Sequence, residues 1–150
     1  MTTHLDAPTD LLRLVGKPLG TTEWIEVTQQ QVDLFADATK DHQWIHTDPE
    51  RAADGPFHGT VAHGYLTLSL APGMIAQVLE IRELAAALNY GLNRVRFPVP
   101  VHVGAAVRAH ITLSSAHQKT SGVESVFALT YEIRGEHRPG CVAEVVVLYP

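Results

Sequence analysis

The sequence predicts an α+β fold, a single domain in which an antiparallel sheet wraps around one buried helix. Two observations carry this prediction. Residues 105–149 contain three runs, mostly alternating between apolar and polar side chains and separated by turn sequences, as expected for an antiparallel meander. Residues 64–81 are instead apolar on nearly all sides, which is typical of a helix enclosed by other elements.

Length and composition fit this fold class. The 150 residues suffice for one domain with a hydrophobic core, and we expect residues 1–20 to be an N-terminal extension of it. With 45% hydrophobic and 18% charged residues, the chain is expected to be globular. A net charge of -5 argues against a nucleic-acid partner. We see no membrane span, basic run or secretory signal in the sequence. Cys141 is the single cysteine, which fits a reducing, cytoplasmic location, and we expect it to be buried in the core.

The first half of the chain is predicted to hold short helices and loops. Residues 28–39 place apolar side chains at helical spacing, with Thr28 as the N-cap. Asp48 is expected to cap a second, short helix that begins at Pro49. Residues 55–64 are rich in glycine and are predicted to form a loop.

The second half is predicted to hold the central helix and the sheet. Pro72 and Gly73 should bend or break the helix predicted over residues 64–81. Residues 89–101 form a strand candidate that ends in prolines. Three further strands are predicted within residues 105–115, 122–135 and 141–149.

One polar stretch, "FADATKDHQWIHTDPE", points to chemistry. It places Asp41 five residues before His46. A carboxylate and a neutral imidazole held together can bind one water molecule between them. A zinc site is the alternative, because the region also supplies further ligand types, but it contains no HExxH motif and no cysteine pair, and we expect no metal. The zinc-ligand types in question are Asp41, His42, His46, His58 and His63.

The segments "DHQWIHTDPERA", "VAHGYLTLSL" and "GLNRVRFPVPV" together resemble the MaoC-like hydratases, also called (R)-specific enoyl-CoA hydratases. The similarity is greatest to the single-domain group that includes nodulation-protein-N-like dehydratases, and it spans residues 20–149. It implies the hotdog fold, in which a long central helix is wrapped by an antiparallel sheet. It also implies a homodimer.

The resemblance assigns roles to particular residues. Asp41 and His46 match the Asp and His of the hydratase signature, which implies that they act as the acid–base pair. His63 and Gly64 match the "HG" that opens the central helix, and the Gly64 N–H, at the start of a helix, is the expected oxyanion donor. The family commonly has Gly where this chain has Lys40. A loop that favours glycine needs a special backbone conformation, so we expect Lys40 to reshape the loop or to bring a cation close to Asp41.

The implied reaction is the hydration of trans-2-enoyl thioesters, or the reverse dehydration, by a lyase of fatty-acid metabolism. No separate cofactor is expected, because coenzyme A is part of the acyl-CoA substrate. Arg94 and Arg96 share one strand face and are candidates for contacts with the coenzyme A phosphates, the alternative being solvated arginines. Tyr65 is either a substrate contact or a core residue. The full set of expected substrate-binding residues is His63, Tyr65, Asn89, Tyr90, Asn93, Arg94 and Arg96.

Two other functions fit the same residues. A hotdog thioesterase would use the carboxylate to direct water at the thioester carbonyl, and it would release free thiol. A non-catalytic acyl-binding subunit of a dehydratase heterodimer would bind the thioester without converting it, and it would purify with a partner chain.

Overall fold

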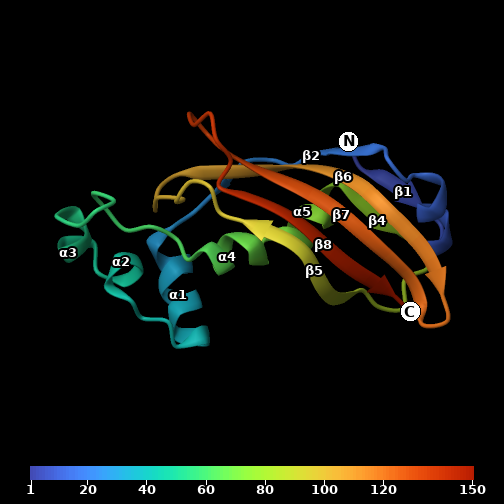
Figure 1. Ribbon diagram of the computed structural model, residues 1–150, viewed down its shortest axis with the longest axis horizontal. Helices are drawn as coiled ribbons and strands as arrows, with labels where there is room; N and C mark the ends of the chain where they lie inside the picture. The colour runs from blue at the N-terminus through green and yellow to red at the C-terminus, as the bar shows by residue number, and fades with distance from the viewer.

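A long antiparallel sheet runs along most of the molecule in the computed structural model, which describes residues 1–150 (Figure 1). Its strands follow the order β2-β6-β7-β8-β5, with β3 paired to β6 beside β2. The predicted antiparallel meander is therefore confirmed in β6, β7 and β8. The strands span Pro18–Thr21 (β2), Ile25–Glu26 (β3), Leu88–Arg96 (β5), Ala106–Lys119 (β6), Gly122–Ile133 (β7) and Cys141–Tyr149 (β8).

The central helix is divided into two short helices that lie against the sheet (Figure 1). They are α4, Gly64–Ser69, and α5, Ala71–Val78, which meet at Leu70. A proline stands in the first turn of α5, as the sequence predicts for a broken helix. The helix prediction was wrong for Leu79–Ile81. These residues form strand β4, because they pair in parallel with β1, Thr3–Leu5.

The core lies between these helices and the sheet. Phe127 and Tyr131 of β7 are completely buried there, and so is Cys141, whose thiol pKa is raised to about 12 by burial. The 3₁₀ helix η1, Pro8–Arg13, adds the fully buried Leu11 to the same core. The N-terminal residues thus pack against the sheet. None of the helices combines the length and hydrophobicity that crossing a membrane requires.

The expectation that the central helix is buried on nearly all sides was wrong for α4. Tyr65 is 72% exposed, whereas Thr67 of the same helix is buried. Leu66 and Leu68 are only partly buried against the core. One face of α4 packs on the sheet, and the opposite face, which carries Tyr65, is largely exposed.

Three short helices extend from the end of the sheet and form the left side of Figure 1. They are α1, Gln29–Thr39, α2, Trp44–Thr47, and α3, Pro49–Ala53. The Thr28 side chain accepts a hydrogen bond from the Gln31 N–H, so the predicted N-cap of α1 is confirmed. Asp48 caps α3 in the same way, through the Arg51 N–H. This helical end and the start of α4 hold the residues of the hydratase signature.

Candidate active site

The chain changes direction sharply between α1 and α2, and this turn positions Asp41. Lys40 ends α1 with φ 66° and ψ 17°, in the left-handed region that favours glycine. Lys40 thus adopts a conformation that suits the glycine common in the family, instead of reshaping the loop. The alternative expectation, a Lys40 cation beside Asp41, was wrong, because the basic group recorded within 4.0 Å of the Asp41 carboxylate is His63. The Asp41 side chain is 53% exposed and is thus accessible to solvent.

His46 lies in α2 and is only 8% exposed. Its Nδ1 atom is 2.6 Å from the carbonyl oxygen of Val61. Since a carbonyl only accepts, Nδ1 carries the proton, and Nε2 is left with a free lone pair. Burial lowers the pKa of His46 and so does the neighbouring His63, while the Val61 hydrogen bond and Asp41 act in the opposite direction. The ring is thus held neutral, with Nε2 able to accept a proton.

His63 stands immediately before α4 and is 3% exposed. Its ring stacks on the ring of His46, with 3.8 Å between the centroids and 24° between the planes. Its Nε2 atom lies 3.0 Å from the backbone oxygen of Asp41 and 3.9 Å from the Asp41 carboxylate. The fold therefore brings together Asp41, His46 and His63, which come from three separate segments.

Gly64 is the first residue of α4, so its N–H has no acceptor within the helix. A Cβ atom at this position would lie 3.0 to 3.1 Å from three atoms of the Phe97 ring. The absence of a side chain therefore lets Phe97 pack directly on the start of α4. Sequence reasoning missed this contact, since nothing in the spacing of Gly64 and Phe97 indicates that they meet.

The three polar side chains also offer atoms that suit a metal. One ligand-type atom from each of Asp41, His46 and His63 lies within 4.8 Å of the others. His42 and His58, the other two residues of the predicted zinc alternative, are not in this group. One nitrogen of each of the two rings is already directed at a backbone carbonyl. Because imidazole lone pairs lie in the ring plane, two nearly parallel rings do not point them at one centre. The arrangement suits a bound water better than a tetrahedral ion.

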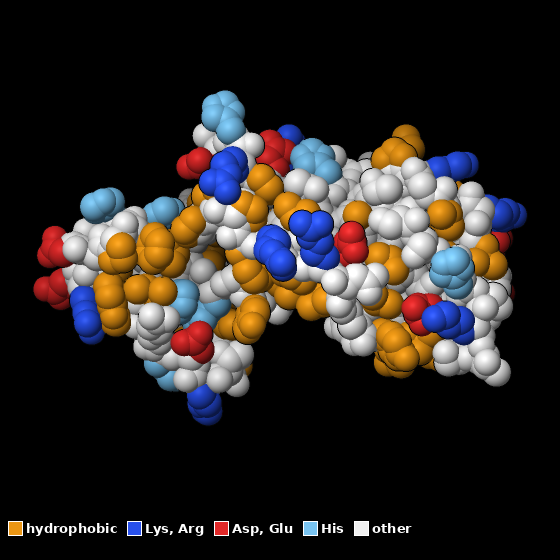
Figure 2. Space-filling view, viewed as in Figure 1, with side chains coloured by type: hydrophobic (Ala, Val, Ile, Leu, Met, Phe, Trp, Pro, Cys, Tyr) orange, Lys and Arg blue, Asp and Glu red, His pale blue; other side chains and the backbone are white.

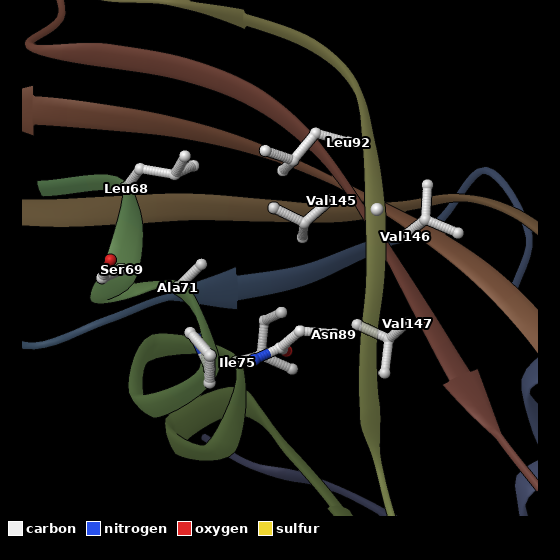
Figure 3. A pocket seen from close by; sticks show the side chains of 11 residues that line it. Leu68, Ser69, Ala71, Ile75, Asn89, Leu92, Val145, Val146 and Val147 are labelled. Atoms are coloured by element: carbon white, nitrogen blue, oxygen red, sulfur yellow. The ribbon is translucent and has the colours of Figure 1, made fainter. Parts of the chain in front are cut away.

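A mainly apolar cavity of about 290 Å³ lies between the two central helices and the strands β5 and β8. Figure 3 shows side chains of α4 and α5 on one side, and Asn89, Leu92 and three valines on the other. Of the residues predicted to bind substrate, Asn89 is the one that lines this cavity. The other residues that line the cavity were not predicted from the sequence. They are Leu68, Ser69, Ala71, Pro72, Ile75, Gly91, Leu92, Val145, Val146 and Val147.

The remaining predicted residues of β5 do not line this cavity. The register with β8 shifts at two places, and Tyr90 and Asn93 are the unpaired residues there. Arg94 and Arg96 lie on one face, as predicted, and line a second hollow with Pro98, Val142, Ala143 and Glu144. Tyr65 instead points to the exposed side of α4, where its ring meets Phe97 edge-on at 6.3 Å.

Comparisons with known proteins place this chain in a family. The profile of the MaoC like domain matches residues 10–134. The 3-hydroxyacyl-thioester dehydratase Z of Mycobacterium tuberculosis (strain ATCC 25618 / H37Rv) is 48% identical over 93% of each chain. Nodulation protein N of Rhizobium leguminosarum bv. viciae is 46% identical over 93% of this chain and 88% of its own.

The fold has solved counterparts as well. The (R)-hydratase from A. caviae involved in PHA biosynthesis superimposes with a TM-score of 0.73 at 24% identity. The match covers 91% of this chain and 96% of that one, so the hotdog architecture is shared almost throughout. The chain therefore belongs to the MaoC-like dehydratase family and is a lyase of the hydratase and dehydratase type.

Proposed function

We propose that this enzyme adds water across the double bond of trans-2-enoyl thioesters to give (R)-3-hydroxyacyl thioesters, or catalyses the reverse dehydration. The observation that carries the proposal is the convergence of Asp41 and His46, whose polar atoms lie within 4.8 Å of each other. The names of the relatives, a 3-hydroxyacyl-thioester dehydratase and an (R)-hydratase, support the same chemistry.

In this proposal one water molecule binds between the Asp41 carboxylate and Nε2 of His46. Both atoms are proton acceptors when His46 is neutral, which its lowered pKa favours. As the water oxygen attacks the β-carbon, the pair takes up a proton and delivers one to the α-carbon. Since both groups lie on one side of the substrate, addition occurs on one face of the double bond. In dehydration the same steps run in reverse.

The thioester oxygen gains negative charge between these two steps and requires a hydrogen-bond donor. We assign this role to the N–H of Gly64, which has no intrahelical acceptor. Leu68 lines the cavity and follows Gly64 by four residues, about 6 Å along the helix axis. A thioester held at Gly64 would thus have its acyl chain directed along α4 toward the cavity.

The proposed substrate is a coenzyme A ester, so no further cofactor is required. The apolar cavity provides a place for the acyl chain, with Asn89 at its wall. Arg94 and Arg96 offer cations to the coenzyme A phosphates from the neighbouring hollow. Tyr90 and Asn93 remain candidates for contacts beside them. Tyr65 is a further candidate, on the exposed side of α4.

We further propose that the enzyme is a homodimer. β5 is an edge strand whose outer side has no partner, and its Leu88, Tyr90 and Leu92 side chains are exposed. Hydrophobic and basic side chains gather over this strand in Figure 2. Long apolar edge strands are usually covered, because their free backbone groups pair readily with other chains. A second copy of this chain would cover both β5 and the exposed face of α4.

A hydration assay with trans-2-enoyl-CoA esters of increasing length tests the function. We expect Asp41→Asn and His46→Gln to fold normally but to lose about 100-fold or more in kcat, because each removes one partner of the acid–base pair. His42→Gln is the matched control: His42 neighbours Asp41 in sequence, but its ring nitrogen contacts Asp37 on the surface, at 3.7 Å. Its kcat should stay within about twofold of the wild-type value.

Three further measurements on the same samples separate the alternatives. Release of free thiol without a hydroxyacyl product would indicate a thioesterase. Binding of the enoyl ester without conversion would indicate a non-catalytic subunit. Light scattering reports whether the purified chain is a dimer of itself. Full activity of either Asp41→Asn or His46→Gln would remove that residue from the mechanism.

A further inference from the structure

His63 is a buried histidine for which the proposed reaction has no direct use. It stacks on the ring of His46 and hydrogen-bonds to the backbone oxygen of Asp41, although 17 and 22 residues, respectively, separate it from them. On another side its ring meets Phe35 of α1, with the centroids 4.9 Å apart. With 3% of its surface exposed, His63 is poorly placed to contact a substrate directly.

The single hydrogen bond of the His63 ring defines which nitrogen donates. Its Nε2 atom lies 3.0 Å from the Asp41 carbonyl, which can only accept, so Nε2 is the nitrogen that carries hydrogen. Nδ1 is buried and has no hydrogen-bond partner. The Nε2 atom also lies 3.9 Å from the Asp41 carboxylate, so the ring faces both the backbone and the side chain of Asp41.

Each of the two proposed catalytic side chains needs an anchor. Asp41 follows a left-handed residue at the end of α1, and its carboxylate is mostly in solvent. The hydrogen bond to its carbonyl fixes the backbone of Asp41 against a buried ring. His46 is tethered at Nδ1 by Val61, and the stacked ring of His63 fixes the plane in which Nε2 points.

We propose that His63 is a positioning residue, whose ring holds the Asp41 backbone by a hydrogen bond and the His46 ring by stacking, and so sets the distance between them. The inference rests on the proposed function of Asp41 and His46. Because His63 directly precedes Gly64, it also ties this pair to the start of α4, where the thioester oxygen would bind. Small displacements in such a site lower the rate by about 10- to 100-fold.

Two variants each keep one of the two contacts. His63→Gln retains an N–H donor for the Asp41 carbonyl but loses the stacked ring, and His63→Phe retains a ring but loses the donor. We expect kcat to fall about 10-fold or more in both variants, while KM changes by less than about threefold.

His102→Gln is the matched control. The His102 ring also bonds to a backbone carbonyl, that of Phe57 at 2.8 Å, but outside the site. Its kcat should be within about twofold of wild type. Wild-type kcat in both His63 variants would overturn the proposal. A lower melting temperature with unchanged kcat per folded enzyme would also overturn it, since that is the result of a purely structural role.

The ring nitrogens of His63, observed by NMR, test the inference without any activity measurement. In the wild-type enzyme the His63 ring should carry its hydrogen on Nε2, the nitrogen that faces the Asp41 carbonyl. A ring with its hydrogen on Nδ1 alone would refute the hydrogen bond to Asp41, even if the variants proved unstable. If instead Asp41→Asn and His46→Gln were fully active, the proposed function would fail, whereas the tautomer of His63 would still report on this contact.

Discussion

Replacing Lys40 by glycine should stabilise the protein, although it removes a side chain that is present in the native enzyme. Lys40 ends α1 with φ 66°, where the Cβ atom of an L-residue crowds the following carbonyl group. Its side chain is exposed and takes part in no recorded ion pair, so little is lost with it. Glycine adopts this conformation freely.

The magnitude follows from two opposing contributions. Relief of the left-handed conformation is worth about 1 to 2 kcal/mol. The greater freedom of glycine in the unfolded chain offsets about 0.4 to 1 kcal/mol of this gain. The net expectation is a free energy of unfolding higher by about 0.5 to 1 kcal/mol, which in a chain of 150 residues raises Tm by about 1 to 4 °C.

Urea unfolding and scanning calorimetry of Lys40→Gly and Lys40→Ala measure this effect. Both variants remove the charge and the long side chain, but alanine keeps its Cβ atom, and with it the strained backbone. Lys40→Ala should therefore stay within about 0.5 kcal/mol of wild type. Equal stabilities of the two variants would refute the reasoning from backbone strain.

Two further predictions concern His46 and Gly122. Burial keeps the pKa of His46 in the folded protein below its ordinary value of 6.5. As the pH falls, His46 therefore binds a proton in the unfolded chain before it does so in the folded protein. The contribution of His46 to stability is thus complete above pH 6.5 and is lost as the pH falls from there through the lowered pKa. The urea midpoint of unfolding should depend less on pH in His46→Gln than in the wild type. If the midpoint changed with pH equally in both proteins, His46 would not be the group whose pKa is lowered by folding. Gly122→Ala should lower the free energy of unfolding in urea by about 3 kcal/mol or more, because Gly122 has φ 134° and a Cβ there would overlap the Tyr149 carbonyl. Gly135→Ala is its control, with φ 84° but open space around the Cβ position; a loss there as large as in Gly122→Ala would rule out the steric explanation.

Helices and strands that are specified by residues close together in the chain could be predicted from the sequence. α1 begins after Thr28, because a threonine hydroxyl and a side-chain amide three residues later satisfy each other's backbone groups. The strands β6 and β7 follow from alternation with a period of two residues. The break at Leu70 follows from a proline that cannot continue a helix. The pair Asp41 and His46 was predicted from a motif of six residues that resembles the hydratase signature.

Contacts between distant segments could not be predicted, because no spacing rule connects residues that only tertiary packing brings together. β4 is a strand because β1 lies beside it, although its three residues continue an apolar helical pattern. The stacking of His63 on His46, and the packing of Phe97 against Gly64, depend on how the loop before α4 crosses the helical end of the molecule. By itself, the sequence determined which side chains the chain brings to the proposed reaction. Only the tertiary structure decided which nitrogen of each ring is free, since that depends on the backbone carbonyl that each ring meets.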